Sequence, residues 1–341
     1  MAATSSSVVT VHPDGDLVLL LELMPIHEPH KSSLKPQINV PNAKVFSPEA
    51  ASSPGETQNG CTKRIHAMLT GDSKEAVELR EKGRTEIPLP DDDACVMITL
   101  VNVLHGRLKS ITKYLDLILL SRIAILVDKY QCHESTEFVV KVWTVKYRVS
   151  PWSRSWYFAA YWIFVAWMFG LDDEFKEATE KIIRQSDMGL GAILRDYNLA
   201  LPITERVINK IDERRKNAVS QLIDVLKDTI SRYQGQTLIC PNHSLPVLDI
   251  ISHRETCDAT VLGSLIKSVT KKKLFPLPEA PFKDPLRYHV VKSSIASLEP
   301  QTACNVLVQD ESLHHNVMGI IGQSIESIDD NISGLSLADC K

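Results

Sequence analysis

Two short stretches in the C-terminal half of the chain carry side chains suited to binding a metal ion. In CPNH, two residues separate Cys240 from His243, and in HRETC, three residues separate His253 from Cys257. Such spacings are typical of zinc ligands, and nine residues lie between the two pairs. Two interpretations stay open: a zinc site that clamps a weakly packed segment, or ordinary buried and surface side chains.

Three adjacent carboxylates, Asp91, Asp92 and Asp93, form a second candidate for chemistry. A cation site would need further oxygen ligands at defined spacing, and the neighbouring sequence offers none. The apolar run that follows has helical periodicity and closes in His105 and Gly106. Carboxylates are favoured where a helix begins, and a basic residue followed by glycine is typical of a helix end. The pattern therefore predicts that the aspartates start a helix.

Catalysis has little support in the sequence. The stretch GDS at 71–73 lies in a polar region without a matching histidine or aspartate. The chain has neither a Walker A loop nor a dinucleotide-binding glycine pattern, and no nucleophile, base and orienting group can be assembled. The sequence predicts a protein that is not an enzyme and has no catalytic residues or organic cofactor.

Composition restricts the partners and the compartment. The 341 residues are 44% hydrophobic and 23% charged, with a net charge of -4, so neither nucleic acid nor an anionic membrane surface is an expected partner. Seven scattered cysteines and the lack of a signal peptide predict an intracellular protein, cytoplasmic or nuclear. The uncharged run 156–171 is 16 residues long, which predicts a buried helix rather than a membrane span.

Hydrophobic periodicity predicts a few strands and many helices. We expect strands at 14–23, 43–47 and 84–90, and residues 1–13 and most of 24–62 without regular structure. The expected helices are 61–69, a polar helix ending at Gly83, 92–105, 113–132, 134–147, 155–170, 173–186, 202–233, 257–269 and 314–328. In the 134–147 helix, Phe138, Val142 and Val145 recur at helical spacing. The stretch LPEAPFKDPLRYHVV is expected to be a connection broken by prolines.

The order of several motifs resembles that of fungal BTB/POZ-domain proteins with a helical C-terminal extension. The matching stretches are HPDGDLVLLLEL, IHAML, LPDDDACVMITLVNVLHGR, IAILVDKYQCHES, AWMF, LPITERVINKIDERR, CDATVLGSLIKSV and SGLSLADCK. The chain departs from the family pattern at 47–62, where SPEAASSPGETQNGC replaces a strand and helix. No single motif is highly specific, and the resemblance depends on their order and spacing.

The resemblance implies an α+β fold: a BTB/POZ-like small sheet capped by helices, followed by a mostly α-helical extension. The expected domains are 14–148 for the BTB/POZ-like part, 149–233 for the helical extension and a partly helical, loosely ordered 234–341. The implied function is protein–protein interaction, by homo- or hetero-oligomerisation or as an adaptor. A homodimer and a cullin-type ubiquitin ligase are conceivable partners, although no motif indicates the ligase. The expected partner surface comprises Val96, Leu100, Leu104, His105, Leu119 and Ile123.

Overall fold

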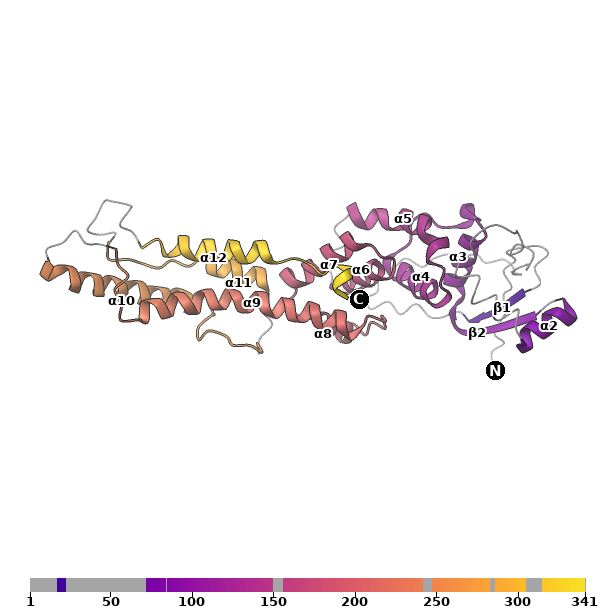
Figure 1. The fold of residues 1–341 in the computed structure, drawn as a ribbon, viewed down its shortest axis with the longest axis horizontal. Helices are drawn as coiled ribbons and strands as arrows, with labels where there is room; N and C mark the ends of the chain where they lie inside the picture. The colour runs from indigo at the N-terminus through magenta and orange to yellow at the C-terminus, as the bar shows by residue number, and fades with distance from the viewer. Residues whose placement is uncertain are drawn as a thin grey trace. The chain divides into compact units, whose positions relative to one another are not determined.

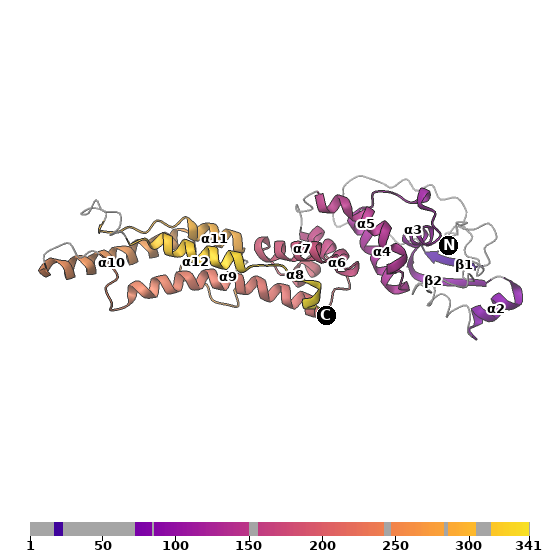
Figure 2. The same ribbon diagram turned by 45° about the horizontal axis from the view of Figure 1, so that its top comes forward.

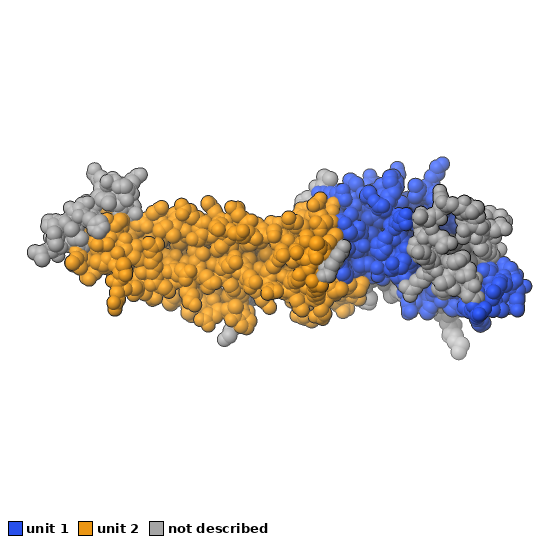
Figure 3. Space-filling view, viewed as in Figure 1, with its two compact units in different colours: residues 1–171 blue, residues 172–341 orange. Residues whose placement is uncertain are grey.

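The computed structural model describes residues 17–22, 72–83, 85–149, 156–241, 247–282, 286–304 and 315–340. The chain divides into two compact units, residues 1–171 and 172–341 (Figure 3). The division falls after α6 rather than at 148/149, because α6 packs against α4 of the first unit. The expected strand at 43–47 and helix at 61–69 lie outside the described residues.

The first unit is mostly helical in its described part and contains a short parallel strand pair (Figure 1). Its elements are β1 (Leu17–Glu22), α2 (Lys74–Lys82), β2 (Thr85–Asp93), α3 (Ala94–Leu104), η2 (Leu108–Ser110), α4 (Leu117–Tyr130), α5 (His133–Val149) and α6 (Trp156–Met168). β1 pairs with β2 in a register that places Leu19 opposite Ile87. The expected strands at 14–23 and 84–90 thus both form and pair with each other.

The helix starts of the first unit follow from side chains that bind free backbone amides. The Asp93 carboxylate accepts hydrogen bonds from the amides of Cys95 (2.9 Å) and Val96 (3.3 Å), which begins α3 as the sequence predicts. Asp91 is exposed and lies before the helix, in β2. The polar helix α2 ends at Gly83, whose φ of 68° is the left-handed conformation that glycine adopts readily.

The aromatic helix α6 belongs to the interior of the first unit. Every residue from Ala159 to Ala166 is buried, including Trp162 and Phe164, because apolar side chains surround the whole helix. It is 13 residues long. Among the described residues, no helix has the length and apolar character needed to cross a membrane.

Helix α5 carries apolar side chains on two opposite faces. Val140 and Trp143 are buried against the unit, and the Trp143 indole N–H donates to the Thr112 carbonyl at 3.0 Å. A second stripe, spaced four and three residues apart, faces solvent and comprises Phe138, Val142 and Val145, which are 69%, 47% and 52% exposed. The helical spacing was recognised in the sequence, but this stripe lies outside the core.

The second unit is built around the long helix α9. Its elements are α7 (Asp172–Gln185), α8 (Leu190–Asp196), α9 (Glu205–Gln234), α10 (Val247–Lys271), α11 (Tyr288–Ala296), α12 (Val317–Asn331) and α13 (Leu337–Cys340). Helices α7, α8, α10, α11 and α12 all contact α9, and α11 and α12 run beside it in both ribbon views (Figures 1 and 2). The buried stripe of α9 includes Val207, Leu222 and Leu226, as its 3.6-residue periodicity predicts.

Three expectations for the second unit need correction. Helix α10 begins at Val247, ten residues earlier than predicted, so Asp258 lies in its middle. The proline-rich connection ends in a true helix, α11, whose Tyr288 and Val291 are buried. The described part of 234–341 contains helices, as the sequence predicted, but α10, α11 and α12 pack on α9, whereas the sequence predicted a loosely ordered region.

Candidate metal centre

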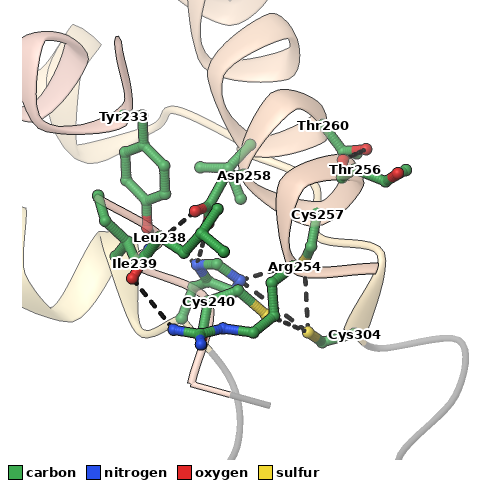
Figure 4. Close-up of polar contacts among 12 residues, drawn as sticks. Tyr233, Leu238, Ile239, Cys240, Arg254, Thr256, Cys257, Asp258, Thr260 and Cys304 are labelled. Carbon is green, nitrogen blue, oxygen red and sulfur yellow. Dashed lines mark hydrogen bonds and ion pairs between the residues drawn. The ribbon is translucent and has the colours of Figure 1, made fainter. Parts of the chain in front are cut away.

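Three cysteines and one histidine meet in the interior of the second unit. Cys240 lies in the segment after α9, Cys257 in α10, Cys304 in the segment after α11, and His315 two residues before α12 (Figure 4). All four residues are buried, and their possible ligand atoms lie within 4.8 Å of one another. Four segments far apart in the sequence therefore converge on one point.

The separations between these atoms suit a tetrahedral ion. Cys304 Sγ lies 3.2 Å from Cys240 Sγ and 3.3 Å from Cys257 Sγ. His315 Nε2 lies 3.1 Å from Cys257 Sγ and 4.0 Å from Cys304 Sγ. Around zinc, with Zn–S near 2.3 Å and Zn–N near 2.0 Å, sulfur atoms stand about 3.8 Å apart and sulfur and nitrogen about 3.5 Å. The four separations each differ from these values by about half an ångström.

Burial has opposite effects on the charge of the thiols and of the imidazole. Burial raises the pKa of the Cys257 and Cys304 thiols, because an isolated thiolate loses its hydration there. Burial also lowers the pKa of His315, against the opposing charge of Asp258, so the imidazole is held neutral, the form that binds metals. A divalent cation would replace the thiol protons and compensate the thiolate charges.

A second layer of polar groups surrounds the histidine. His315 Nδ1, on the ring side away from the sulfurs, lies 3.0 Å from the Tyr233 hydroxyl and 3.9 Å from Asp258 Oδ1. The other oxygen, Asp258 Oδ2, accepts a hydrogen bond from the Ile239 amide at 2.8 Å (Figure 4). Asp258 thus lies beside His315 and directly follows Cys257 in the chain. It also accepts a hydrogen bond from Ile239, the residue before Cys240.

Arg254 braces the segment that carries Cys240. Its guanidinium group donates to the carbonyl of Cys240 at 2.8 Å and to that of Leu238 at 3.1 Å (Figure 4). Arg254 is three residues before Cys257 on α10, so the helix positions its own cysteine and the neighbouring one together.

The chemistry available to this arrangement is metal binding without an open coordination position. Three sulfurs and one imidazole nitrogen form a soft donor set with tetrahedral preference, which suits zinc. Catalytic zinc sites keep one position for water or substrate, and structural sites use four protein ligands. With all four donors supplied by buried side chains, the cluster fits the structural class.

The structure retains two of the four metal ligands considered from the sequence and adds two others. Cys240 and Cys257 both belong to the cluster. His253 lies at its edge, with Nε2 3.7 Å from Cys304 Sγ, and His243 lies outside the described residues. Cys304 and His315 were missed, because 46 residues separate Cys257 from Cys304 and no local spacing marks them.

The residues expected to form a partner surface lie mainly in the core of the first unit. Val96 and Ile123 are fully buried and Leu100 is 1% exposed, since they face the α3–α4 contact. Leu104, His105 and Leu119 are half-buried, and His105 ends α3 as predicted. A partner could not contact the three buried residues without opening the unit.

Comparisons with known proteins add no further constraint on the site. No protein-family model, no curated protein and no solved structure matches this chain.

Proposed function

We propose that the second unit is a zinc-stabilised helical module, in which Cys240, Cys257, Cys304 and His315 bind one structural zinc ion. The observation that carries the proposal is the convergence of four buried donor atoms within 4.8 Å from four separate segments. Three thiols outside any disulfide and an imidazole lie together in the buried interior of the second unit, and a metal gives them a common partner.

The ion would cross-link segments that the helices alone leave far apart in sequence. It would join the end of α9 to α10, to the segment after α11 and to the start of α12. Structural zinc contributes its binding free energy to folding, on the order of 10 kcal/mol in small zinc-dependent domains. This contribution is large beside the 5–15 kcal/mol typical of a whole domain.

Metal analysis of the purified full chain tests the proposal. We expect one zinc per chain, and a cobalt-substituted protein with the thiolate charge-transfer and tetrahedral d–d bands of a sulfur-rich site. Cys257→Ser should lose the metal, whereas Cys95→Ser, the same change at a free, partly buried cysteine of α3, should keep it. Chelation and reloading of the wild-type chain gives the same information if Cys257→Ser does not fold. A metal-free wild-type protein that gains no stability from added zinc would refute the site.

For the first unit we propose a protein-interaction role of the BTB/POZ type, with a second copy of this chain as the partner. It is supported by the exposed stripe of Phe138, Val142 and Val145 on α5. The first turn of α5 carries Glu134, and its last turn carries Lys146 and Arg148. An antiparallel copy would set the acidic end of one helix against the basic end of the other. The implied small BTB-like sheet, and an adaptor role toward a cullin-type ligase, remain parts of this proposal.

Measurement of the oligomeric state tests this second role. Replacement of Phe138 and Val145 by glutamate should convert a dimer to a monomer without loss of thermal stability, because both side chains are exposed in one chain. Ile320→Glu, at an exposed apolar position of α12, is the matched control and should leave the dimer intact. A wild-type chain that sediments as a monomer at high protein concentration would exclude the homodimer.

A further inference from the structure

A buried carboxylate oxygen beside the cysteine–histidine cluster lacks a hydrogen-bond partner. Asp258 Oδ1 is fully inaccessible to solvent, and no donor reaches it within the part of the chain that the structure describes. The other oxygen of the same carboxylate is engaged by the Ile239 amide. Buried polar atoms without a partner are uncommon, and each calls for a physical cause. His315 Nδ1 lies 3.9 Å from this oxygen, beyond hydrogen-bonding distance.

We propose that Asp258 is the positioning residue of the zinc site, selecting the His315 tautomer that leaves Nε2 free for the metal and orienting His315 and Cys240 together. The inference rests on the proposed zinc centre. The inference concerns the hydrogen bonds that orient the ligands. The identity of the four donor atoms does not determine these hydrogen bonds.

The tautomer follows from what each side of the imidazole ring faces. Nε2 points to the sulfurs of Cys257 and Cys304, and Nδ1 points to Tyr233 and Asp258. A neutral imidazole carries one proton, and a metal on Nε2 requires that proton on Nδ1. The Asp258 carboxylate can only accept, and the Tyr233 oxygen can also accept, so both stabilise Nδ1–H. A carboxylate behind a ligating histidine also strengthens the nitrogen as a donor.

Metal binding supplies the partner that Asp258 Oδ1 lacks. With the proton fixed on Nδ1, a small rotation of the ring brings N–H and carboxylate into hydrogen-bonding distance. Alternatively, Tyr233 accepts from Nδ1–H and donates its own hydroxyl proton to Asp258, since a hydroxyl can do both. In either arrangement the Nδ1–H tautomer of the neutral ring gives the orphaned oxygen a partner and leaves Nε2 without a proton.

The same carboxylate couples two ligands mechanically. Asp258 Oδ2 holds the Ile239 amide, and Ile239 is followed directly by Cys240. Asp258 itself follows Cys257 on α10. Arg254, one turn earlier, holds the carbonyl of Cys240 from the other side. The α10 helix therefore presents one ligand and positions two more through a single side chain.

Asp258→Asn separates the electronic role from the shape of the side chain. The asparagine oxygen can keep accepting from the Ile239 amide, which turns the NH2 group toward His315. A donor would then face Nδ1 and favour the proton on Nε2, where it blocks the metal. We expect the zinc affinity of the full chain to fall about 10- to 100-fold, the usual effect of losing such an outer partner.

The experiment is a zinc titration of the full chain against a chromophoric chelator, with two comparison variants. Asp224→Asn changes an exposed aspartate of α9 and should keep the wild-type affinity. Tyr233→Phe removes one acceptor but keeps the carboxylate, and should fall between wild type and Asp258→Asn. Long-range ¹H–¹⁵N spectra of the histidine rings should show the His315 proton on Nδ1 in metal-free wild type. In metal-free Asp258→Asn the proton should move to Nε2.

The outcomes distinguish this inference from the zinc site itself. If wild type binds zinc and Asp258→Asn binds it equally well, the positioning role is wrong and the zinc site stands. If Asp258→Asn loses as much stability in the presence of chelator as in the presence of zinc, its role is structural, which also overturns the inference. If wild type binds no zinc, both proposals fail.

Discussion

Adjacent residues can serve different purposes, as Asp92 and Asp93 show. Asp93 caps α3 and pairs with Arg122 at 2.9 Å, in line with the helix start that the sequence predicted. Asp92 is 1% exposed and accepts hydrogen bonds from Lys129 Nζ at 2.7 Å and from the Tyr130 hydroxyl at 2.5 Å. Capping is a local property that spacing reveals. The partners of Asp92 lie 37 and 38 residues later, so its role emerged only from the fold.

Distance along the chain also limited how far the metal centre could be predicted. Cys240 and Cys257 stood out because each has a histidine at zinc-like spacing. The sequence therefore pointed to His243 and His253 as the other two ligands, whereas the structure brings Cys304 and His315 to the two cysteines. The correct set requires α10 and α12 to lie beside α9, and no periodicity in the sequence specifies that placement.

Asp329 of α12 offers a residue-scale prediction in which pH is the variable. Its carboxylate accepts from Arg184 Nη1 (2.5 Å), the Tyr288 hydroxyl (3.0 Å) and Lys292 Nζ (2.9 Å). Burial opposes ionisation, but these partners outweigh it and hold the pKa of Asp329 below its ordinary 3.8. A lowered folded-state pKa gives stability that is present above pH 3.8 and is lost as the pH falls below it.

Asp329→Asn should therefore reduce the acid-induced loss of stability. In metal-free protein at pH 6, we expect the free energy of unfolding of wild type to exceed that of Asp329→Asn by about 1 kcal/mol. This difference should shrink between pH 4 and pH 2. Unfolding by urea at a series of pH values measures it. The control, Asp330→Asn, changes the same charge at an exposed neighbour without touching Arg184, Tyr288 or Lys292. A wild-type advantage that is independent of pH would contradict the ion-pair explanation.

At the scale of elements, prediction succeeded where local signals agreed with one another. Helix α6 is apolar on all sides, which favours a position inside the unit. Helix α9 has one broad apolar stripe, which favours burial of that face alone. The strands β1 and β2 were each predicted from the sequence. Their parallel pairing was not predicted and is known only from the structure. In a long segment the same apolar spacing recurs several times, so the sequence alone identifies it as a helix or a strand.

The environment of an element, and not its periodicity, decides which of its apolar faces is covered. The spacing of Phe138, Val142 and Val145 is the spacing of a core stripe, yet the core contacts the opposite face through Val140 and Trp143. Periodicity identifies that a helix has an apolar face, and packing decides which of two faces is covered. The same limit explains Val96, Leu100 and Ile123, which looked available for a partner and are interior.

At the scale of the whole molecule, the proposed metal centre would give the two units different sources of stability. The first unit buries large aromatic side chains, with Trp143, Trp162 and Phe164 at 2% exposure or less. Among the residues that the structure describes, the second unit buries fewer aromatic side chains, and its proposed metal lies where four segments meet. Hydrophobic burial is insensitive to chelators, whereas a structural zinc is removed by them. The two units should therefore respond separately to loss of metal.

The distribution of tryptophan makes this separation measurable in the intact chain. All five tryptophans, at positions 143, 152, 156, 162 and 167, fall in the first unit, and residues 172–341 contain none. Tryptophan fluorescence consequently reports unfolding of the first unit, and far-ultraviolet circular dichroism reports helices of both.

Chelation of the wild-type chain should lower the midpoint of a circular-dichroism transition by more than 10 °C, because the zinc contribution is several kcal/mol. The fluorescence transition should stay in place. Cys257→Ser should reproduce the chelated pattern without chelator, and Cys95→Ser should not. If chelation moved both transitions together, the units would unfold as one cooperative body and the metal would stabilise the whole chain.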